Sequence, residues 1–149
     1  MAIYYGCGLR NSEGERIKLN HIHYEKSLLQ VLPGKSYKGR YVPLSAGVAK
    51  DLKEYQKYSR PYLAIENQEY LIIGKFGKFM KGSSMGNRIK QLVEKAGIQK
   101  QISLHGLRHS IATHLLQGGM PLEQISRFLG HNSLDSTQIY TRLMEEINE

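Results

Sequence analysis

The stretch that decides the fold is "SLHGLRHSIATHLLQ" at 103–117 together with "GGMPLEQISRFLG" at 118–130. Apolar residues recur at helical spacing in the first segment and predict one buried stripe made of Leu104, Leu107, Ile111 and Leu115. The glycine pair at 118–119 ends that helix, and Pro121 suits the first turn of the next one. The second helix is expected to end at Gly130 and to bury Leu122, Ile125, Phe128 and Leu129. Two consecutive amphipathic helices indicate a helical body.

The flanking sequence adds a small sheet and more helices. Strand-like segments run from 21–26 ("HIHYEK") through 27–33 ("SLLQVLP") to 39–44 ("GRYVPL"), with glycines bracketing a turn at 34–39. Further helices are expected over 46–58 after Ser45, from Ser83 or Ser84 to Ala96, and over 136–147. The stretch 70–84 predicts a short apolar strand and then a basic loop. The predicted fold is α+β, mainly α, with a small antiparallel sheet near the N-terminus.

Composition indicates one globular domain, 1–149, with a polyanionic partner. The net charge is +8 and the pI about 9.6. Residues 1–100 carry a balance of +10 and residues 101–149 a balance of −2, so a nucleic-acid surface would lie mainly on the first two-thirds. Membrane-surface binding is the weaker alternative, because the chain has no strongly basic amphipathic helix. No apolar run approaches the length of a membrane span, and no secretion signal is recognised. The single cysteine, Cys7, fits a reducing cytoplasm.

Four side chains are suited to phosphate chemistry without a metal. His105 and Arg108 are three residues apart and are expected to share a helix face off the apolar stripe. His131 directly follows the glycine that ends a helix, and Tyr140 lies nine residues further on. An arginine can grip phosphate oxygens, a histidine can move a proton, and a tyrosine hydroxyl is a competent nucleophile.

Four segments together resemble the catalytic domain of the tyrosine site-specific recombinases. They are "GLRNSE" at 8–13, "GKSYKGRYVPL" at 34–44, "HGLRHSIATHLL" at 105–116 and "LGHNSLDSTQIYTRL" at 129–143. The resemblance covers almost the whole chain. It implies an enzyme that cuts and rejoins double-stranded DNA through a 3′-phosphotyrosyl bond, without metal, ATP or other cofactor.

The resemblance also implies a role for each matching residue. Arg10 and Arg108 would clamp the phosphate, and Lys35 would protonate the 5′ oxygen. His105 would assist proton transfer at the tyrosine, His131 would hydrogen-bond the scissile phosphate, and Tyr140 would attack it. The family works as a homotetramer on two DNA duplexes. The resemblance also implies a cytoplasmic protein with no membrane or small-molecule partner. The resemblance further suggests a C-terminal domain that lacks the family's N-terminal DNA-binding domain.

Basic side chains outside these six are expected to contact the DNA backbone. They are Lys38, Arg40, Lys75, Lys78, Lys81 and Arg88. Lys38 also competes with Lys35 for the role of acid, because both belong to the same turn. The run "GKFGKFMK" at 74–81 is interpreted first as a solvated loop, and otherwise as a segment lying along DNA.

Other interpretations remain open at this stage. Glu13 is expected to be an exposed carboxylate or, alternatively, to stabilise Arg10 electrostatically. His109 and His114 are expected to have structural roles. "HGLRH" could in principle bind a metal, but it lacks the glutamate of the zinc-protease helix. A type IB topoisomerase, a non-catalytic DNA-binding domain of the same fold and a metal-dependent nuclease are the rival functions.

Overall fold

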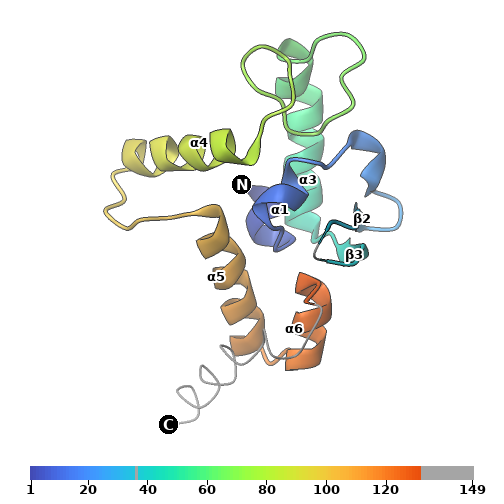
Figure 1. Cartoon of the computed structure of the whole chain (residues 1–149), viewed down its shortest axis with the longest axis vertical. Helices are drawn as coiled ribbons and strands as arrows, with labels where there is room; N and C mark the ends of the chain where they lie inside the picture. Colours follow the sequence, from blue (N-terminus) through green and yellow to red (C-terminus); the bar gives the residue numbers. More distant parts are fainter. Residues whose placement is uncertain (36, 132–149) are drawn as a thin grey trace.

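The computed structural model describes residues 1–35 and 37–131, and its elements follow the predicted order. The helices and strands are α1 (Ala2–Gly6), α2 (Asn11–Gly14), β1 (Ile22–His23), β2 (Leu28–Val31), β3 (Arg40–Pro43), α3 (Ala46–Glu54), α4 (Gly82–Lys95), α5 (Leu104–Gln117) and α6 (Leu122–Leu129). Short helical turns lie at Leu19–His21, Tyr55–Ser59 and Arg60–Tyr62. Helix α1 lies at the centre, against α3 and α5, and α4 projects to one side (Figure 1). The predicted fold class, mainly α with a small antiparallel sheet, is confirmed.

The sheet is antiparallel with strand order β1-β2-β3. Ile22 faces Leu29 and Leu29 faces Val42 across the two ladders, and all three side chains are buried. Because side chains alternate between the faces of a strand, this register turns one apolar face toward α1. Beyond β2, a single antiparallel bridge joins Gly34 to Tyr37.

The apolar strand predicted within 70–73 does not form. Single antiparallel bridges join Lys18 to Tyr70 and Ile73 to Phe79 instead. Gly77 has a φ of +70°, a left-handed conformation that reverses the chain between the bridged residues before a ladder can extend.

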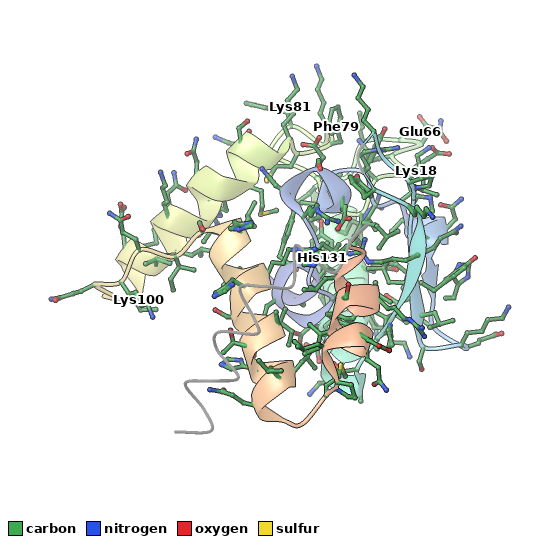
Figure 2. The ribbon with its side chains drawn as sticks, turned by 60° about the horizontal axis from the view of Figure 1, so that its bottom comes forward. Lys18, Glu66, Phe79, Lys81, Lys100 and His131 are labelled. Atoms are coloured by element: carbon green, nitrogen blue, oxygen red, sulfur yellow. The ribbon has the colours of Figure 1, made fainter. Side chains whose placement is uncertain are left out.

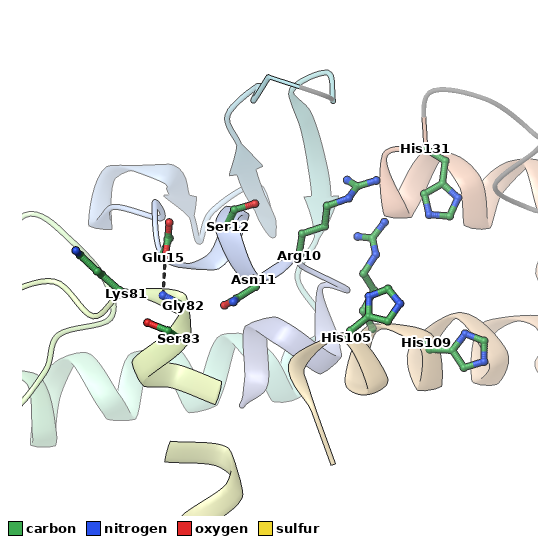
Figure 3. Close-up of a pocket in the computed structure, with 11 residues that line it drawn as sticks. Arg10, Asn11, Ser12, Glu15, Lys81, Gly82, Ser83, His105, His109 and His131 are labelled. Atoms are coloured by element: carbon green, nitrogen blue, oxygen red, sulfur yellow. Dashed lines mark hydrogen bonds between the residues drawn. The ribbon is translucent and has the colours of Figure 1, made fainter. Parts of the chain in front are cut away.

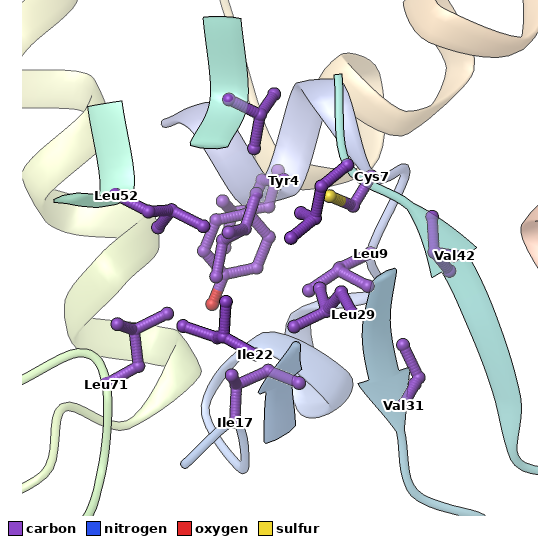
Figure 4. Close-up of a cluster of buried hydrophobic side chains, with 14 of the residues drawn as sticks. Tyr4, Cys7, Leu9, Ile17, Ile22, Leu29, Val31, Val42, Leu52 and Leu71 are labelled. Atoms are coloured by element: carbon purple, nitrogen blue, oxygen red, sulfur yellow. The ribbon is translucent and has the colours of Figure 1, made fainter. Parts of the chain in front are cut away.

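Two hydrophobic clusters hold the elements together. The larger surrounds Tyr4 of α1 and Cys7, the residue after α1, and joins the sheet to α3 and α4 (Figure 4). The smaller consists of Ala112, Leu116, Ile125 and Leu129, between α5 and α6. Phe128 packs against both clusters and so connects the α5–α6 pair to the rest.

The start of α4 differs from the prediction for a physical reason. The helix begins at Gly82, before the serines expected to open it. The Glu15 carboxylate accepts a hydrogen bond from the Gly82 backbone N–H at 2.6 Å. A carboxylate from α2's end therefore supplies the cap that the sequence suggested from Ser83 or Ser84. Helix α3 does start as predicted, with Ser45 Oγ accepting from Val48 N.

The buried face of α5 is also not the predicted stripe. Its fully buried positions are spaced by four and comprise Leu104, Arg108, Ala112 and Leu116. The apolar residues expected to form the stripe after Leu104 are only partly buried and flank this line. Arg108, expected off the apolar stripe, lies on the buried face. Helix α6 ends as predicted at Gly130, with φ +66° and ψ +49°. The helix predicted over 136–147 lies outside the described residues. No helix in the described part of the chain is long and apolar enough to cross a membrane.

Candidate active site

A groove of about 820 Å³ runs from the start of α4, past α2, to α5 and the end of α6. Figure 3 shows Lys81 and Ser83 at one end and His105, His109 and His131 at the other. Arg10 lies between these ends, and Arg108 also lines the groove. The groove is therefore an elongated depression with basic groups along its length.

A buried carboxylate organises the arginine end of the groove. The Glu13 side chain is fully buried and accepts from Arg10 Nη1 at 2.9 Å and from Arg40 Nη1 at 2.7 Å. Arg40 Nη2 reaches the other Glu13 oxygen at 3.0 Å, which makes that pair bidentate. Arg108 Nη1 lies 3.9 Å from Glu13 Oε2. Since Glu13 comes three residues after Arg10, its carboxylate also accepts the Arg10 backbone N–H at the start of α2.

The same three arginines bind the C-terminal end of α6. Its last carbonyls have no partner within a helix and form the negative end of the helix dipole. The bonds run from Arg40 Nε to Phe128 O (2.8 Å), from Arg108 Nη2 to Leu129 O (2.8 Å) and from Arg10 Nη2 to Gly130 O (3.2 Å). Arg108 also donates to Gly8 O. These bonds fix the position of His131, the next residue along the chain.

This cluster leaves an excess of positive charge beneath the groove. Three guanidinium groups face one carboxylate, and the Arg10 side chain remains 30% exposed. Burial raises the pKa of the Glu13 carboxyl, but hydrogen bonds and charge from Arg40, and then Arg10, outweigh it and hold the pKa below its ordinary value. Glu13 is thus ionised at neutral pH, and the net charge still attracts an anion to the groove.

His131 is neutral at physiological pH. Burial lowers the pKa of its imidazole to about 4, and the nearby charges of Arg108, Arg10 and Arg40 act in the same direction. A neutral imidazole beside these arginines can donate one hydrogen bond to an anion and accept another. A bound phosphate would favour the protonated form and raise this pKa.

The structure brings four of the six predicted catalytic residues into one groove. They are Arg10, His105, Arg108 and His131. Lys35 is exposed at the hairpin tip and does not line the groove. Tyr37, two residues on, stacks on Arg10 with 5.1 Å from the guanidinium carbon to the ring centroid, so this hairpin lies beside the arginine end. Tyr140 lies outside the described residues.

The competing lysine of the same hairpin shares a pocket with His131. Lys38, with Arg127 and His131, lines a neighbouring pocket of about 300 Å³. The choice between Lys35 and Lys38 as the acid therefore stays a prediction.

The arginine cluster bears on two further expectations. The Arg40 side chain is 8% exposed and is engaged by Glu13 and Phe128 O, and its contact with DNA stays a prediction. The default interpretation of Glu13 as an exposed carboxylate is wrong, and its alternative role beside Arg10 is confirmed.

The two further histidines of α5 differ from each other. His109, expected in a structural role, is exposed and lines the groove. His114 Nδ1 lies 2.7 Å from Tyr5 Oη, a contact that joins α5 to α1, as a structural role requires. Residues 1–35 and 37–131 contain no cluster of three or more histidine, cysteine, aspartate or glutamate side chains that could hold a metal ion.

The other predicted DNA contacts are spread along the basic surface. Lys81 lines the groove, whereas Lys75 and Lys78 are exposed in the turn that precedes it. Arg88 is exposed on α4, where Nη1 donates to Gln91 Oε1 at 3.3 Å.

Sequence reasoning missed the lining residues at the α4 end of the groove. They are Asn11, Ser12, Glu15, Gly82 and Ser83. A Cβ on Gly82 would lie 2.2 Å from Asn11 Oδ1, so α2 and α4 approach each other closely here and a larger residue would displace the Asn11 amide. No local pattern signals this contact, because its two sides are about seventy residues apart in the chain; only the glycine before "SS" hints at a close approach.

The fold is a mainly helical domain, and its elongated groove is lined by two arginines and three histidines. The sequence pattern of the phage integrase family matches residues 1–146, and the chain belongs to this family.

Comparison with individual relatives gives the same result. The chain is 34% identical over 146 residues to the tyrosine recombinase XerC of Lacticaseibacillus casei, covering 96% of this chain and 49% of the relative. It is 36% identical over 144 residues to the tyrosine recombinase XerA of Pyrococcus furiosus, covering 95% of this chain and 48% of the relative. The chain thus spans about half the length of the curated relatives it matches.

Solved structures show the same fold. A crystal structure of XerA recombinase superposes with a TM-score of 0.85 at 32% identity, covering 94% of this chain and 50% of that one. The pre-cleavage complex of the XerH site-specific recombinase with its difH substrate gives a TM-score of 0.74 at 30% identity. The match covers 97% of this chain and 42% of that one.

Proposed function

We propose that this chain is the catalytic domain of a tyrosine site-specific recombinase that cuts and rejoins double-stranded DNA. The observation that carries the proposal is the groove in which Arg10, Arg108, His105 and His131 converge. Family membership and the recombinase names of the relatives support it.

In the first half of the reaction, the scissile phosphate binds at the arginine end of the groove. Arg10 and Arg108 neutralise its non-bridging oxygens, and His131 donates a hydrogen bond to it. The Tyr140 hydroxyl oxygen attacks phosphorus while His105 helps to remove its proton. The bond to the 5′ oxygen breaks, and that oxygen takes a proton from Lys35. The products are a 3′-phosphotyrosyl bond and a free 5′ hydroxyl.

In the second half, the 5′ hydroxyl of another strand attacks the phosphotyrosyl bond and restores the Tyr140 hydroxyl. The number of phosphoester bonds is conserved, so the exchange needs no ATP. A homotetramer on two duplexes would supply the second strand. The cytoplasm, where the chromosome lies, is the proposed location.

The test is covalent trapping on DNA in the presence of EDTA, with Tyr140→Phe as the matched variant. We expect detergent-stable protein–DNA adducts with the wild-type protein and none with the variant, which should keep its DNA affinity because only one hydroxyl is removed. Adducts of equal yield with Tyr140→Phe would contradict the assignment of the nucleophile. Salt-sensitive DNA binding without any adduct would favour a non-catalytic DNA-binding domain.

A further inference from the structure

Residues 73–79, here called the 73–79 turn, present an exposed aromatic ring at their tip. Gly74 N donates to Lys78 O at 2.8 Å, which closes the turn. Phe76 lies at the tip with 78% of its surface exposed. Burial of a phenylalanine ring normally stabilises a fold, and the described fold makes no use of this one.

The tip is held firmly rather than frayed. Gln68 Nε2 donates to Gly77 O at 2.6 Å. A Cβ on Gly77 would lie 2.5 Å from Ile65 Cγ2, so the 65–68 segment packs directly on the back of the turn. The Phe76 ring is therefore held in an exposed position before any partner binds, which lowers the entropic cost of binding.

The charged side chains of the turn itself are lysines, and the acidic Glu66 belongs to the segment behind it. Lys75 Nζ lies 5.9 Å from the Phe76 ring centroid, and Lys78 is exposed two residues on. The sequence has no acidic residue between Glu69 and Glu94. Such a patch complements a polyanion, and the apolar tip requires a partner that also offers an apolar or π surface.

The 73–79 turn leads directly into the candidate active site. Lys81, two residues past Phe79, lines the groove. Figure 2 shows Phe79 and Lys81 projecting from the same edge of the molecule. A DNA strand lying along the groove from the arginine cluster to Lys81 would meet the turn next.

We propose that the 73–79 turn is a DNA-contacting finger in which the Phe76 ring enters a groove of the bound duplex and packs against its bases. Lys75 and Lys78 bind the phosphates on either side. This inference rests on the proposed function only in requiring duplex DNA as the ligand. Apolar side chains inserted at base steps unstack and bend DNA, so the finger would act on DNA shape beside the cleavage site.

Tryptophan fluorescence tests the contact directly, because the chain contains no tryptophan. In Phe76→Trp, adding a mixed-sequence DNA duplex at low salt should quench the emission and protect it from acrylamide. The matched control is Tyr58→Trp, since Tyr58 is 61% exposed and also has a neighbouring lysine over its ring, Lys57 at 4.8 Å. Emission in the control should not change.

Binding measurements separate the ring from the charges. Phe76→Ala should weaken duplex binding roughly tenfold without changing the salt dependence, because stacking contributes no counterion release. Lys75→Ala should instead lower the salt slope by about one. Tyr58→Ala should change neither quantity.

The outcomes distinguish this inference from the proposed function. DNA binding with an unchanged Phe76→Trp emission, or an equal change in Tyr58→Trp, would overturn the finger and leave the recombinase proposal intact. A response to anionic lipid vesicles or to protein concentration, but not to duplex DNA, would overturn it too. A Phe76→Trp response to duplex DNA would support the finger even if Tyr140→Phe forms adducts as the wild type does.

Discussion

At the scale of single residues, Glu13 decides how the arginines are arranged. It is the acidic partner of Arg10, Arg40 and Arg108 at distances of 2.9, 2.7 and 3.9 Å. Removing one partner of a buried ion pair leaves the other charge desolvated and uncompensated. Glu13 is thus expected to be a positioning residue for the groove rather than a group that reacts.

Glu13→Gln should therefore lower the free energy of unfolding by roughly 3–5 kcal/mol, because the buried Arg40 guanidinium loses its counter-charge. The measurement is urea unfolding followed by circular dichroism. Lys18 and Glu69 provide the matched control, since their ion pair is also 2.7 Å long but is exposed. Glu69→Gln should leave the denaturant midpoint unchanged. If both variants lost the same free energy of unfolding, burial would not be the reason for the stabilising effect of the Glu13–Arg40 ion pair.

The sequence anticipated part of this residue-scale arrangement. The spacing of Glu13 and Arg10 made a local pair conceivable, since residues three apart on a helix are neighbours. The pairing of Arg40 with Glu13 could not be predicted, because it joins residues 27 apart through the packing of β3 on α2. The sequence therefore predicts a DNA contact for Arg40 but not its contact with Glu13.

At the scale of elements, the end of α6 connects the fold to the site. Gly130 adopts a left-handed conformation that ends the helix, and a Cβ there would lie 2.8 Å from Arg40 Nη1. Position 130 therefore favours glycine for two reasons, the left-handed backbone and the lack of room for a Cβ. At Gly97, which follows α4 with a φ of +67°, only the backbone favours glycine, because a Cβ there would meet nothing within 4 Å.

Gly97→Ala should cost about 1–2 kcal/mol of stability, the penalty of a left-handed non-glycine residue. Gly130→Ala should cost a further ~1–3 kcal/mol, because Arg40 must move. Only the second variant should also weaken DNA binding, since it disturbs the carbonyls that the arginines hold. Thermal unfolding and a binding isotherm for each variant provide the measurement. If Gly130→Ala matches Gly97→Ala in both stability and DNA affinity, then Arg40 can move aside without a cost in free energy.

At the scale of the whole molecule, three titratable groups with lowered pKa values make stability depend on pH in the same direction. Burial and the charge of Lys18 lower the pKa of His21, and the pKa of His131 is about 4. Because both histidines bind protons more readily when unfolded, their stabilisation is complete above about pH 6.5 and is lost as the pH falls. The lowered pKa of Glu13 adds a further loss below about pH 4.5.

The free energy of unfolding should consequently fall steadily as the pH drops below about 6.5. Chemical denaturation at a series of pH values measures this. His21→Asn should reduce the slope between about pH 6.5 and 5, because an amide oxygen can replace Nδ1 as the acceptor of the Lys18 N–H without titrating. Stability that rises as the pH drops through this range would contradict the neutral state of both histidines.

Sequence alone is enough to predict the helices of 103–130, the three-stranded sheet and the family, because periodicity, turn residues and motif spacing are local properties. It also identifies four residues that the structure places in one groove. Packing between distant segments accounts for the rest: Arg108 is buried, Glu15 caps α4, and Phe76 is held exposed on a braced turn. These features depend on contacts between segments as far apart as Arg10 and Gly130, which are separated by 120 positions. Such contacts follow from how helices and strands pack, and no local pattern in the chain encodes them.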